Sequence, residues 1–215
     1  GETVRTLIPK HGIDLDLFCA WFLPISDAMA YAHEMGVTHR DLKPGNLMVK
    51  HEGTPKILDF GLARITGPEG LYRDSSQELT SPGGILVSPA YMLPEQVTGQ
   101  QVGPLSDLFS LGVVMYDAIT GRHPFLGDNT LATAHRIIHD DPPSAFDLKL
   151  IPPVAGDLLT TCLQKRPIDR YQSMRALHQV FDDLSGTLNG SEFEASPHSA
   201  INTSVIRPTR KLAVI

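Results

Sequence analysis

The sequence has little cysteine and no long apolar run. Its 215 residues include two cysteines, Cys19 and Cys162, which are too few for a disulfide scaffold. Each lies in an apolar stretch with helical spacing, which indicates a reducing compartment, and we therefore expect a cytoplasmic location. No apolar run reaches the length of about 20 residues that a membrane-spanning helix needs, so a complete span is not expected within the sequence.

An excess of positive charge is also missing. Lysine and arginine number 18 against 24 aspartates and glutamates, which gives a formal net charge of −6 at pH 7. Non-specific nucleic-acid binding depends on a basic surface, so we expect no nucleic-acid partner. The hydrophobic fraction of 41% is ordinary for a globular protein, and the length suits one large domain or two small ones.

What the sequence does contain is helical periodicity, which predicts a mainly α fold. Apolar residues recur at three- and four-residue steps over residues 14–35, although Pro24 predicts a kink or a break near Leu23. Residues 105–120 are apolar on nearly every side, which is typical of a buried helix. Shorter helices are expected over residues 130–139, 154–164 and 173–184.

A small β component and a long loop complete the expected domain. Residues 46–50 and 55–58 have the character of two short strands joined by a turn. Residues 61–90 show no periodicity, which predicts a long loop. Loops of that length inside compact domains usually carry function.

The end of the chain differs in composition from the rest. Residues 186–206 are rich in Ser, Thr, Asn, Glu and Pro, which predicts a flexible linker. Three basic residues and a short apolar ending follow, which suit either the cytoplasmic edge of a transmembrane helix beyond Ile215 or a frayed tail. Because residue 1 is glycine with no signal-peptide pattern after it, we expect a longer parent protein, with a domain over 1–185 and a tail over 186–215.

Three segments carry the clearest chemistry. They are His39-Arg40-Asp41-Leu42-Lys43-Pro44-Gly45-Asn46, Asp59-Phe60-Gly61 and Ser88-Pro89-Ala90-Tyr91-Met92-Leu93-Pro94-Glu95-Gln96. In this order they resemble the catalytic loop, the metal-binding triplet and the end of the activation segment of eukaryotic-type serine/threonine protein kinases, in particular the prokaryotic members. The resemblance covers residues 1–185 and implies a protein-kinase-like fold.

The resemblance gives four residues roles in catalysis and metal binding. Phosphoryl transfer depends on positioning and charge neutralisation, so Asp41 would orient the attacking hydroxyl and accept its proton, and Lys43 would neutralise the phosphate. Asn46 and Asp59 supply the hard oxygen ligands that Mg²⁺ prefers. ATP and Mg²⁺ are the implied cofactors, and proteins with Ser or Thr acceptors are the implied substrates.

Two further residues are implied in nucleotide binding. Met48 would form an apolar floor below the adenine; its alternative is plain core packing. Glu2 would contact the ribose, although a glutamate at a helix start is also common for dipole reasons alone.

The resemblance also implies regulation through the long loop. Arg40 marks kinases that are controlled by phosphorylation of the activation loop, because arginine can pair with the added phosphate. Thr80 and Ser81 are the candidate phosphosites. Self-association is the implied route to their phosphorylation.

The remaining implied residues are architectural. Glu95 is expected to pair with Arg170, because a buried carboxylate needs an opposite charge. Asp107 would hold the backbone amides of the catalytic loop, although it also suits a simple helix start. Ser88 keeps the hydroxyl that would bridge the catalytic carboxylate and lysine. The set is completed by neighbours of the catalytic residues: His39, Phe60 and Gly61.

The other half of the kinase signature is not in these 215 residues. No Gly-x-Gly-x-x-Gly precedes Asp41, and the one upstream lysine, Lys10, lacks a Val-Ala-x-Lys context. We therefore expect the C-terminal lobe of a kinase with its N-terminal lobe absent, inactive alone, from a parent that transfers the ATP γ-phosphoryl group to Ser or Thr. The alternative is a pseudokinase or a lobe-only protein-interaction module.

Overall fold

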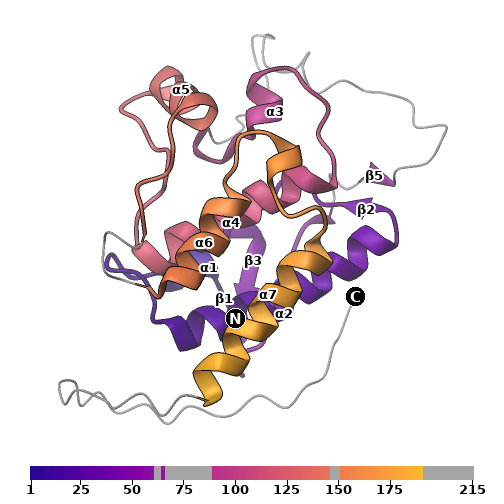
Figure 1. The fold of residues 1–215 in the computed structure, drawn as a ribbon, viewed down its shortest axis with the longest axis vertical. Helices are drawn as coiled ribbons and strands as arrows, with labels where there is room; N and C mark the ends of the chain where they lie inside the picture. The colour runs from indigo at the N-terminus through magenta and orange to yellow at the C-terminus, as the bar shows by residue number, and fades with distance from the viewer. Residues whose placement is uncertain (61–63, 66–88, 146–150, 191–215) are drawn as a thin grey trace.

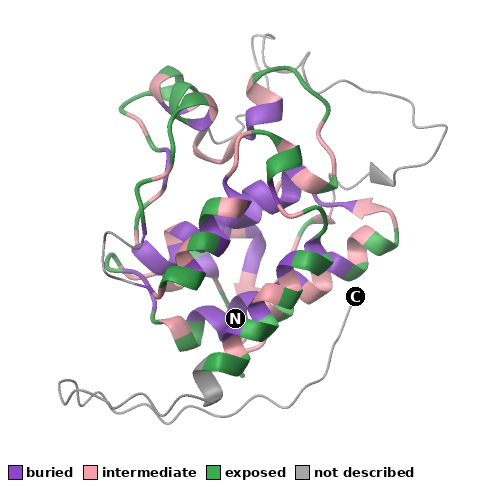
Figure 2. Cartoon of the chain, viewed as in Figure 1, coloured by how far each residue is buried: buried purple, intermediate pink, exposed green. Residues whose placement is uncertain are grey.

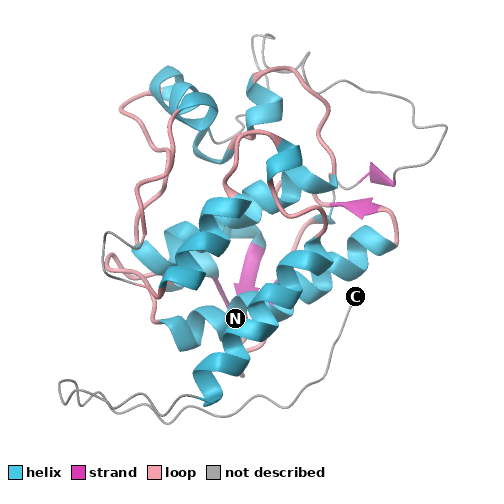
Figure 3. Ribbon diagram, viewed as in Figure 1, coloured by secondary structure: helices cyan, strands magenta, loops and turns pink. Residues whose placement is uncertain are grey.

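The computed structural model describes residues 1–60, 64–65, 89–145 and 151–190. Within these residues the fold is mainly helical, with a few short strands in two small sheets (Figures 1 and 3). The prediction of a mainly α fold with a small β component is therefore confirmed.

Two of the long helices, α2 (Leu15–Glu34) and α7 (Met174–Gly190), lie side by side (Figure 1). Of the kink or break predicted near Leu23, the break is wrong, because α2 continues through Pro24. Proline removes one backbone donor and costs a helix about 3 kcal/mol. Burial of the apolar face on both sides of it offsets that loss, through Phe18, Phe22, Ile25 and Met29.

The length of α7 also differs from the prediction. The helix was expected to end at residue 184, with a linker from 186, but it continues to Gly190. Its first turns are fastened to α2 by Arg175, which contacts Asp27 at 2.7 Å and Glu34 at 3.0 Å. The remainder of the predicted linker, 191–215, lies outside the described residues.

Helix α4 (Pro104–Thr120) forms the centre of the core, as its all-round apolar sequence predicts (Figure 2). The loop before α2 crosses the end of α4 with backbone against backbone. A Cβ atom on Gly12 would lie 2.0 Å from the Ile119 carbonyl oxygen, and one on Gly121 would lie 2.3 Å from the Lys10 carbonyl oxygen. Both glycines also have positive φ, so neither position accepts a side chain.

Four shorter helices complete the helical part of the described residues. The predicted helices at 130–139 and 154–164 appear as α5 (Thr130–His139) and α6 (Pro153–Cys162). Two single-turn helices, α1 (Val4–Leu7) and α3 (Pro94–Val97), were not predicted. None of the helices in the described ranges is both long and apolar enough to cross a bilayer.

The predicted hairpin is present but shorter. Strands β3 (Leu47–Val49) and β4 (Pro55–Ile57) pair antiparallel, and β1 (Glu2–Thr3) pairs with the other edge of β3. Asn46, expected in the first strand, instead ends a 3₁₀ turn over Pro44–Asn46, called η1. A second pair joins β2 (Val37–Thr38) to β5 (Arg64–Ile65).

Candidate active site

Three of the predicted site residues meet in the loop between β2 and β3. Lys43 Nζ donates to Asp41 Oδ2 at 2.6 Å, and Asn46 Nδ2 donates to the same oxygen at 3.1 Å and to the Asp41 carbonyl at 2.9 Å. The 3₁₀ turn η1 produces this arrangement, because it folds Asn46 back over the residues before it. One carboxylate oxygen is thus held by a cation and an amide.

Asp107 of α4 holds the backbone of this loop, as predicted. The buried Asp107 carboxylate accepts from the backbone N–H of His39 and of Arg40, each at 2.8 Å. Arg40 has φ +68°, a strained angle for a side chain of this size, and the two bonds hold it there. His33 Nε2 also donates to Asp107 at 2.8 Å; nothing in the sequence pattern pointed to this histidine.

His39 links the loop to the residue that precedes the metal-binding triplet. Its Nε2 donates to the Leu58 carbonyl at 3.0 Å, so Nδ1 is the acceptor for the Asp41 N–H at 3.3 Å. Its ring lies 4.8 Å from that of Phe60. His39 is fully buried and packs the catalytic loop against the start of the triplet.

Asp59 is brought close to Asn46 by the hairpin. The Leu58 N–H donates to the Asn46 carbonyl at 2.8 Å, directly before Asp59, which is exposed and has φ +56°. The two donated bonds of Asn46 use its amide nitrogen, which leaves the amide oxygen for a ligand. A carboxylate and an amide oxygen on adjacent turns fit the oxygen-only preference of Mg²⁺.

The two residues implied in nucleotide binding lie on the three-stranded sheet. Met48 is half-buried in β3, and its sulfur lies beside Gly1, where a Cβ atom would approach it to 3.2 Å. Glu2 is exposed in β1, opposite Val49. Because Met48 lies opposite Thr3 and side chains alternate along a strand, the register directs Glu2 and Met48 to opposite faces of the sheet, and their contacts with adenine and ribose stay predictions.

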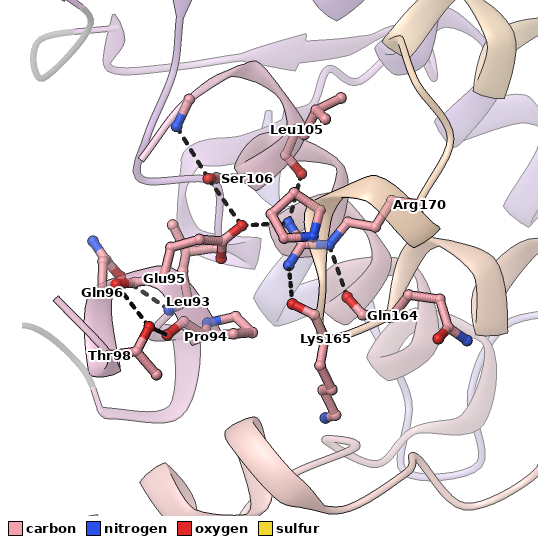
Figure 4. A network of polar contacts seen from close by, with 12 residues as sticks. Leu93, Pro94, Glu95, Gln96, Thr98, Leu105, Ser106, Gln164, Lys165 and Arg170 are labelled. Atoms are coloured by element: carbon pink, nitrogen blue, oxygen red, sulfur yellow. Dashed lines mark hydrogen bonds and ion pairs between the residues drawn. The ribbon is translucent and has the colours of Figure 1, made fainter. Parts of the chain in front are cut away.

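The predicted pair between Glu95 and Arg170 is present and buried (Figure 4). Arg170 Nη1 donates to Glu95 Oε1 at 2.7 Å, and Ser106 Oγ donates to the same oxygen at 3.3 Å. The other Arg170 donors reach three backbone carbonyls, those of Leu105, Gln164 and Lys165. One guanidinium thus joins α3, α4 and the loop after α6.

A family comparison agrees with this geometry. Residues 1–181 match the model of the protein kinase domain. The chain belongs to the protein kinase family.

Three curated relatives of this kinase domain come from bacteria. It is 34% identical over 194 residues to a probable serine/threonine-protein kinase of Streptomyces coelicolor, covering 89% of this chain and 26% of the relative. It is 33% identical over 179 residues to probable serine/threonine-protein kinase PknB of Corynebacterium glutamicum, covering 80% and 27%. Serine/threonine-protein kinase PknL of Mycobacterium tuberculosis is 33% identical over 195 residues, covering 90% and 47%. The chain thus spans between a quarter and a half of these relatives.

Several kinase residues named from the sequence lie outside the described residues: Gly61, Thr80, Ser81 and Ser88. Arg40, the predicted partner of a phosphate on Thr80 or Ser81, is half-buried, and its Nε has no hydrogen-bond partner among the described residues. The phosphate contact of Arg40 therefore stays a prediction.

A half-buried polar cluster at the end of the activation segment was not predicted. Tyr91 donates to Asp117 of α4, and its ring lies 5.2 Å from that of His123, edge to face. Burial raises the pKa of Tyr91 to about 12 and lowers the pKa of His123 to about 4. Burial also raises the pKa of Asp117. Tyr91 belonged to a recognised segment, whereas single polar residues at positions 117 and 123 gave no signal.

Proposed function

We propose that this kinase domain transfers the γ-phosphoryl group of ATP to Ser or Thr hydroxyls of proteins when it forms part of a longer protein. The observation that carries the proposal is the carboxylate of Asp41, held by Lys43 at 2.6 Å and by Asn46 at 3.1 Å. The names of the bacterial relatives support serine and threonine as the acceptors.

The proposed chemistry follows from what each side chain can do. Asp41 orients the acceptor hydroxyl and takes its proton through a carboxylate oxygen. Lys43, two residues on, presents its ammonium to both Asp41 and the transferring phosphate, where negative charge accumulates. Asn46 and Asp59 would hold Mg²⁺, which supplies positive charge to the phosphate oxygens when bound.

We also propose that residues 1–185 correspond to the C-terminal lobe of a two-lobed kinase. The sequence carries no glycine-rich loop or strand lysine before Asp41, and these parts normally cover the phosphates. The 215-residue chain alone is then expected to have little or no transferase activity. The proposal for the parent protein extends to a cytoplasmic location, at a membrane where a span follows Ile215.

Regulation is proposed on the same basis. Phosphorylation of Thr80 or Ser81, by a second copy of the kinase, would give Arg40 an anionic partner. Phosphopeptide mapping of the parent protein, with Thr80→Ala and Ser81→Ala as separate variants, tests this directly. A fully active parent with neither residue phosphorylated contradicts it.

The test of the main proposal separates nucleotide binding from transfer. The purified chain is melted with and without Mg²⁺-ATP, and in parallel it is incubated with labelled ATP and a Ser/Thr-containing protein. We expect a Mg²⁺-dependent rise in Tm that is lost in Asp59→Ala, together with no labelled product. Absence of any Mg²⁺-ATP shift favours the pseudokinase or interaction-module alternative, and clear incorporation contradicts the one-lobe proposal.

A further inference from the structure

Lys165 lies between the buried Glu95–Arg170 pair and helix α5. Its backbone carbonyl accepts from Arg170 Nη2 at 2.9 Å, whereas its side chain extends away from Arg170 (Figure 4). At the far end, Nζ donates to the carbonyl oxygen of Arg136 at 3.3 Å. That carbonyl lies in the last turn of α5, at the negative end of the helix dipole, where a cation is favourable. Lys165 therefore links Arg170 to the C-terminal end of α5.

Two stacked aromatic rings support the two cations. The rings of Phe109 and Phe125 are fully buried and nearly parallel, with centroids 5.8 Å apart and an interplanar angle of 8°. Arg170 Cζ lies 5.0 Å from the centroid of Phe109, and Lys165 Nζ lies 3.7 Å from that of Phe125. Aromatic faces attract cations within about 6 Å of the centroid. We call these four side chains the ring stack; it joins the guanidinium that holds Glu95 to the ammonium that contacts α5.

The contacts of Nζ suit the charged ammonium. An N–H donated to a carbonyl and a position over an aromatic face are both stronger for a cation than for a neutral amine. Burial lowers the pKa of Lys165 to about 8, and the nearby Asp141 and Asp140 oppose this shift, so roughly nine tenths of the side chain stays charged at pH 7. The charge that the ring stack requires is therefore present near neutral pH.

Helix α5 has few buried side chains of its own. It packs against α3 and against the 3₁₀ turn Pro89–Tyr91. Of its ten residues, Thr133 and Ile137 are buried. Because Glu95 belongs to α3, the two helices are joined twice, once by direct packing and once through the Glu95–Arg170 pair and the ring stack. Loss of the charge at Lys165 removes the second connection and leaves the first.

We propose that Lys165 is a positioning residue whose ammonium keeps α5 seated on α3 and on the turn Pro89–Tyr91. It acts through α5 and Arg170, not on the reacting groups. By the kinase resemblance, the turn and α3 end the activation segment and directly follow Ser88, whose hydroxyl is expected to contact the catalytic groups. A displaced α5 therefore weakens binding of the acceptor protein more than binding of ATP. That last step rests on the proposed function, whereas the hold on α5 does not.

The first test is hydrogen exchange in the full 215-residue chain, read by mass spectrometry near neutral pH. Lys165→Met keeps an apolar chain of similar length over the rings but removes the charge, and Lys165→Arg keeps a cation as the matched control. We expect exchange in residues 130–139 to be about tenfold faster in the Met variant, with the Arg variant close to the unsubstituted chain and residues 15–34 unchanged in both. Equal exchange of 130–139 in the two variants overturns the proposal, as does an equal increase in residues 15–34.

A double-mutant cycle tests whether the ring carries the effect. Phe125→Leu keeps an apolar side chain in the core and removes the aromatic face. Because Lys165→Met and Phe125→Leu remove the same contact, we expect the double variant to exchange residues 130–139 little faster than the faster single variant does. Increases that multiply in the double variant show that charge and ring act separately, and they contradict the ring stack.

The effect on transfer is measured in the parent protein. We expect Lys165→Met to raise KM for the acceptor protein several-fold and to leave KM for ATP unchanged, with Lys165→Arg close to the unsubstituted protein. A rise in KM for ATP alone, or no change in either KM, overturns the positioning role. A parent that transfers no phosphate contradicts the proposed function, and the exchange measurements then decide the hold on α5 by themselves.

Discussion

Two ion pairs in this kinase domain have nearly equal lengths but very different exposure to water. Lys43 and Asp41 are 2.6 Å apart with side chains 35% and 30% exposed, whereas Arg170 and Glu95 are 2.7 Å apart and 0% and 2% exposed. Water screens the first pair, which can exchange partners with little cost. The second pair has lost its hydration, so each charge depends on the other. Distance alone therefore does not distinguish the two pairs, whereas exposure does.

Breaking the buried pair tests this contrast most strongly. Arg170→Met leaves the Glu95 carboxylate buried without a cation, and we expect a loss of about 3 to 5 kcal/mol in the free energy of unfolding, measured in urea. The matched control is the double variant Glu95→Leu/Arg170→Met, which removes both charges and should recover part of the loss. A single-variant loss below about 1 kcal/mol means that the pair is as weak as a surface pair.

Acid pH provides a second test of how burial affects a charge, because burial favours the neutral form of His123. Its pKa is about 4 in the folded chain and about 6.5 when unfolded, so the unfolded state binds more protons between these values. The contribution of His123 to the free energy of unfolding is fully present above pH 6.5. It falls by about 2 to 3 kcal/mol as the pH drops toward 4. The measurement is the unfolding free energy of the unsubstituted chain minus that of His123→Gln across this range. A difference that does not change with pH rejects the assignment.

Asp107 is buried like the Glu95–Arg170 pair, yet it accepts hydrogen bonds from the loop that contains the exposed Asp41. Asp107→Asn presents one oxygen instead of two to the N–H groups of His39 and Arg40. We expect a loss of about 2 kcal/mol in unfolding free energy and faster hydrogen exchange at those two amides. Unchanged protection of both amides would show that another group holds the loop. Asp117→Asn, on the same helix, is the control for a general loss of charge in α4.

The exposed pair should give the smallest change in stability. Asp41→Asn removes the partner of a solvated lysine, and we expect the unfolding free energy to change by at most about 1 kcal/mol. In the parent protein the same substitution should abolish phosphoryl transfer, because the base is lost. A loss above about 2 kcal/mol in the free energy of unfolding would show that this pair stabilises the fold as strongly as a buried pair does.

The motif residues were the most predictable part of the molecule. Lys43 reaches Asp41 as expected, and Glu95 pairs with Arg170 although 75 residues separate them. These residues are recognisable because their chemistry restricts which side chains serve at each position. The central helix was predictable for a different reason, since a segment that is apolar all round can only be buried.

The remaining features depend on packing that periodicity does not encode. Local propensity breaks a helix at Pro24, but burial against α7 carries α2 through it. His33 was missed because its role depends on Asp107, which is 74 residues distant. Two-residue strands such as β1 and β5 are fixed by their partners, and their own sequences are too short to give an alternating pattern.

The crossing of the loop before α2 over the end of α4 affects how functional positions in this protein are found by mutagenesis. At Gly12 and Gly121 even an alanine methyl group would meet a carbonyl oxygen, and no change at the other glycine makes room for it. On the proposed function, a variant library scored on phosphoryl transfer will rank both positions beside Asp41, although the two glycines only shape the backbone crossing. Scoring protein abundance in the same library separates them, because Asp41 variants accumulate and variants at the two glycines do not.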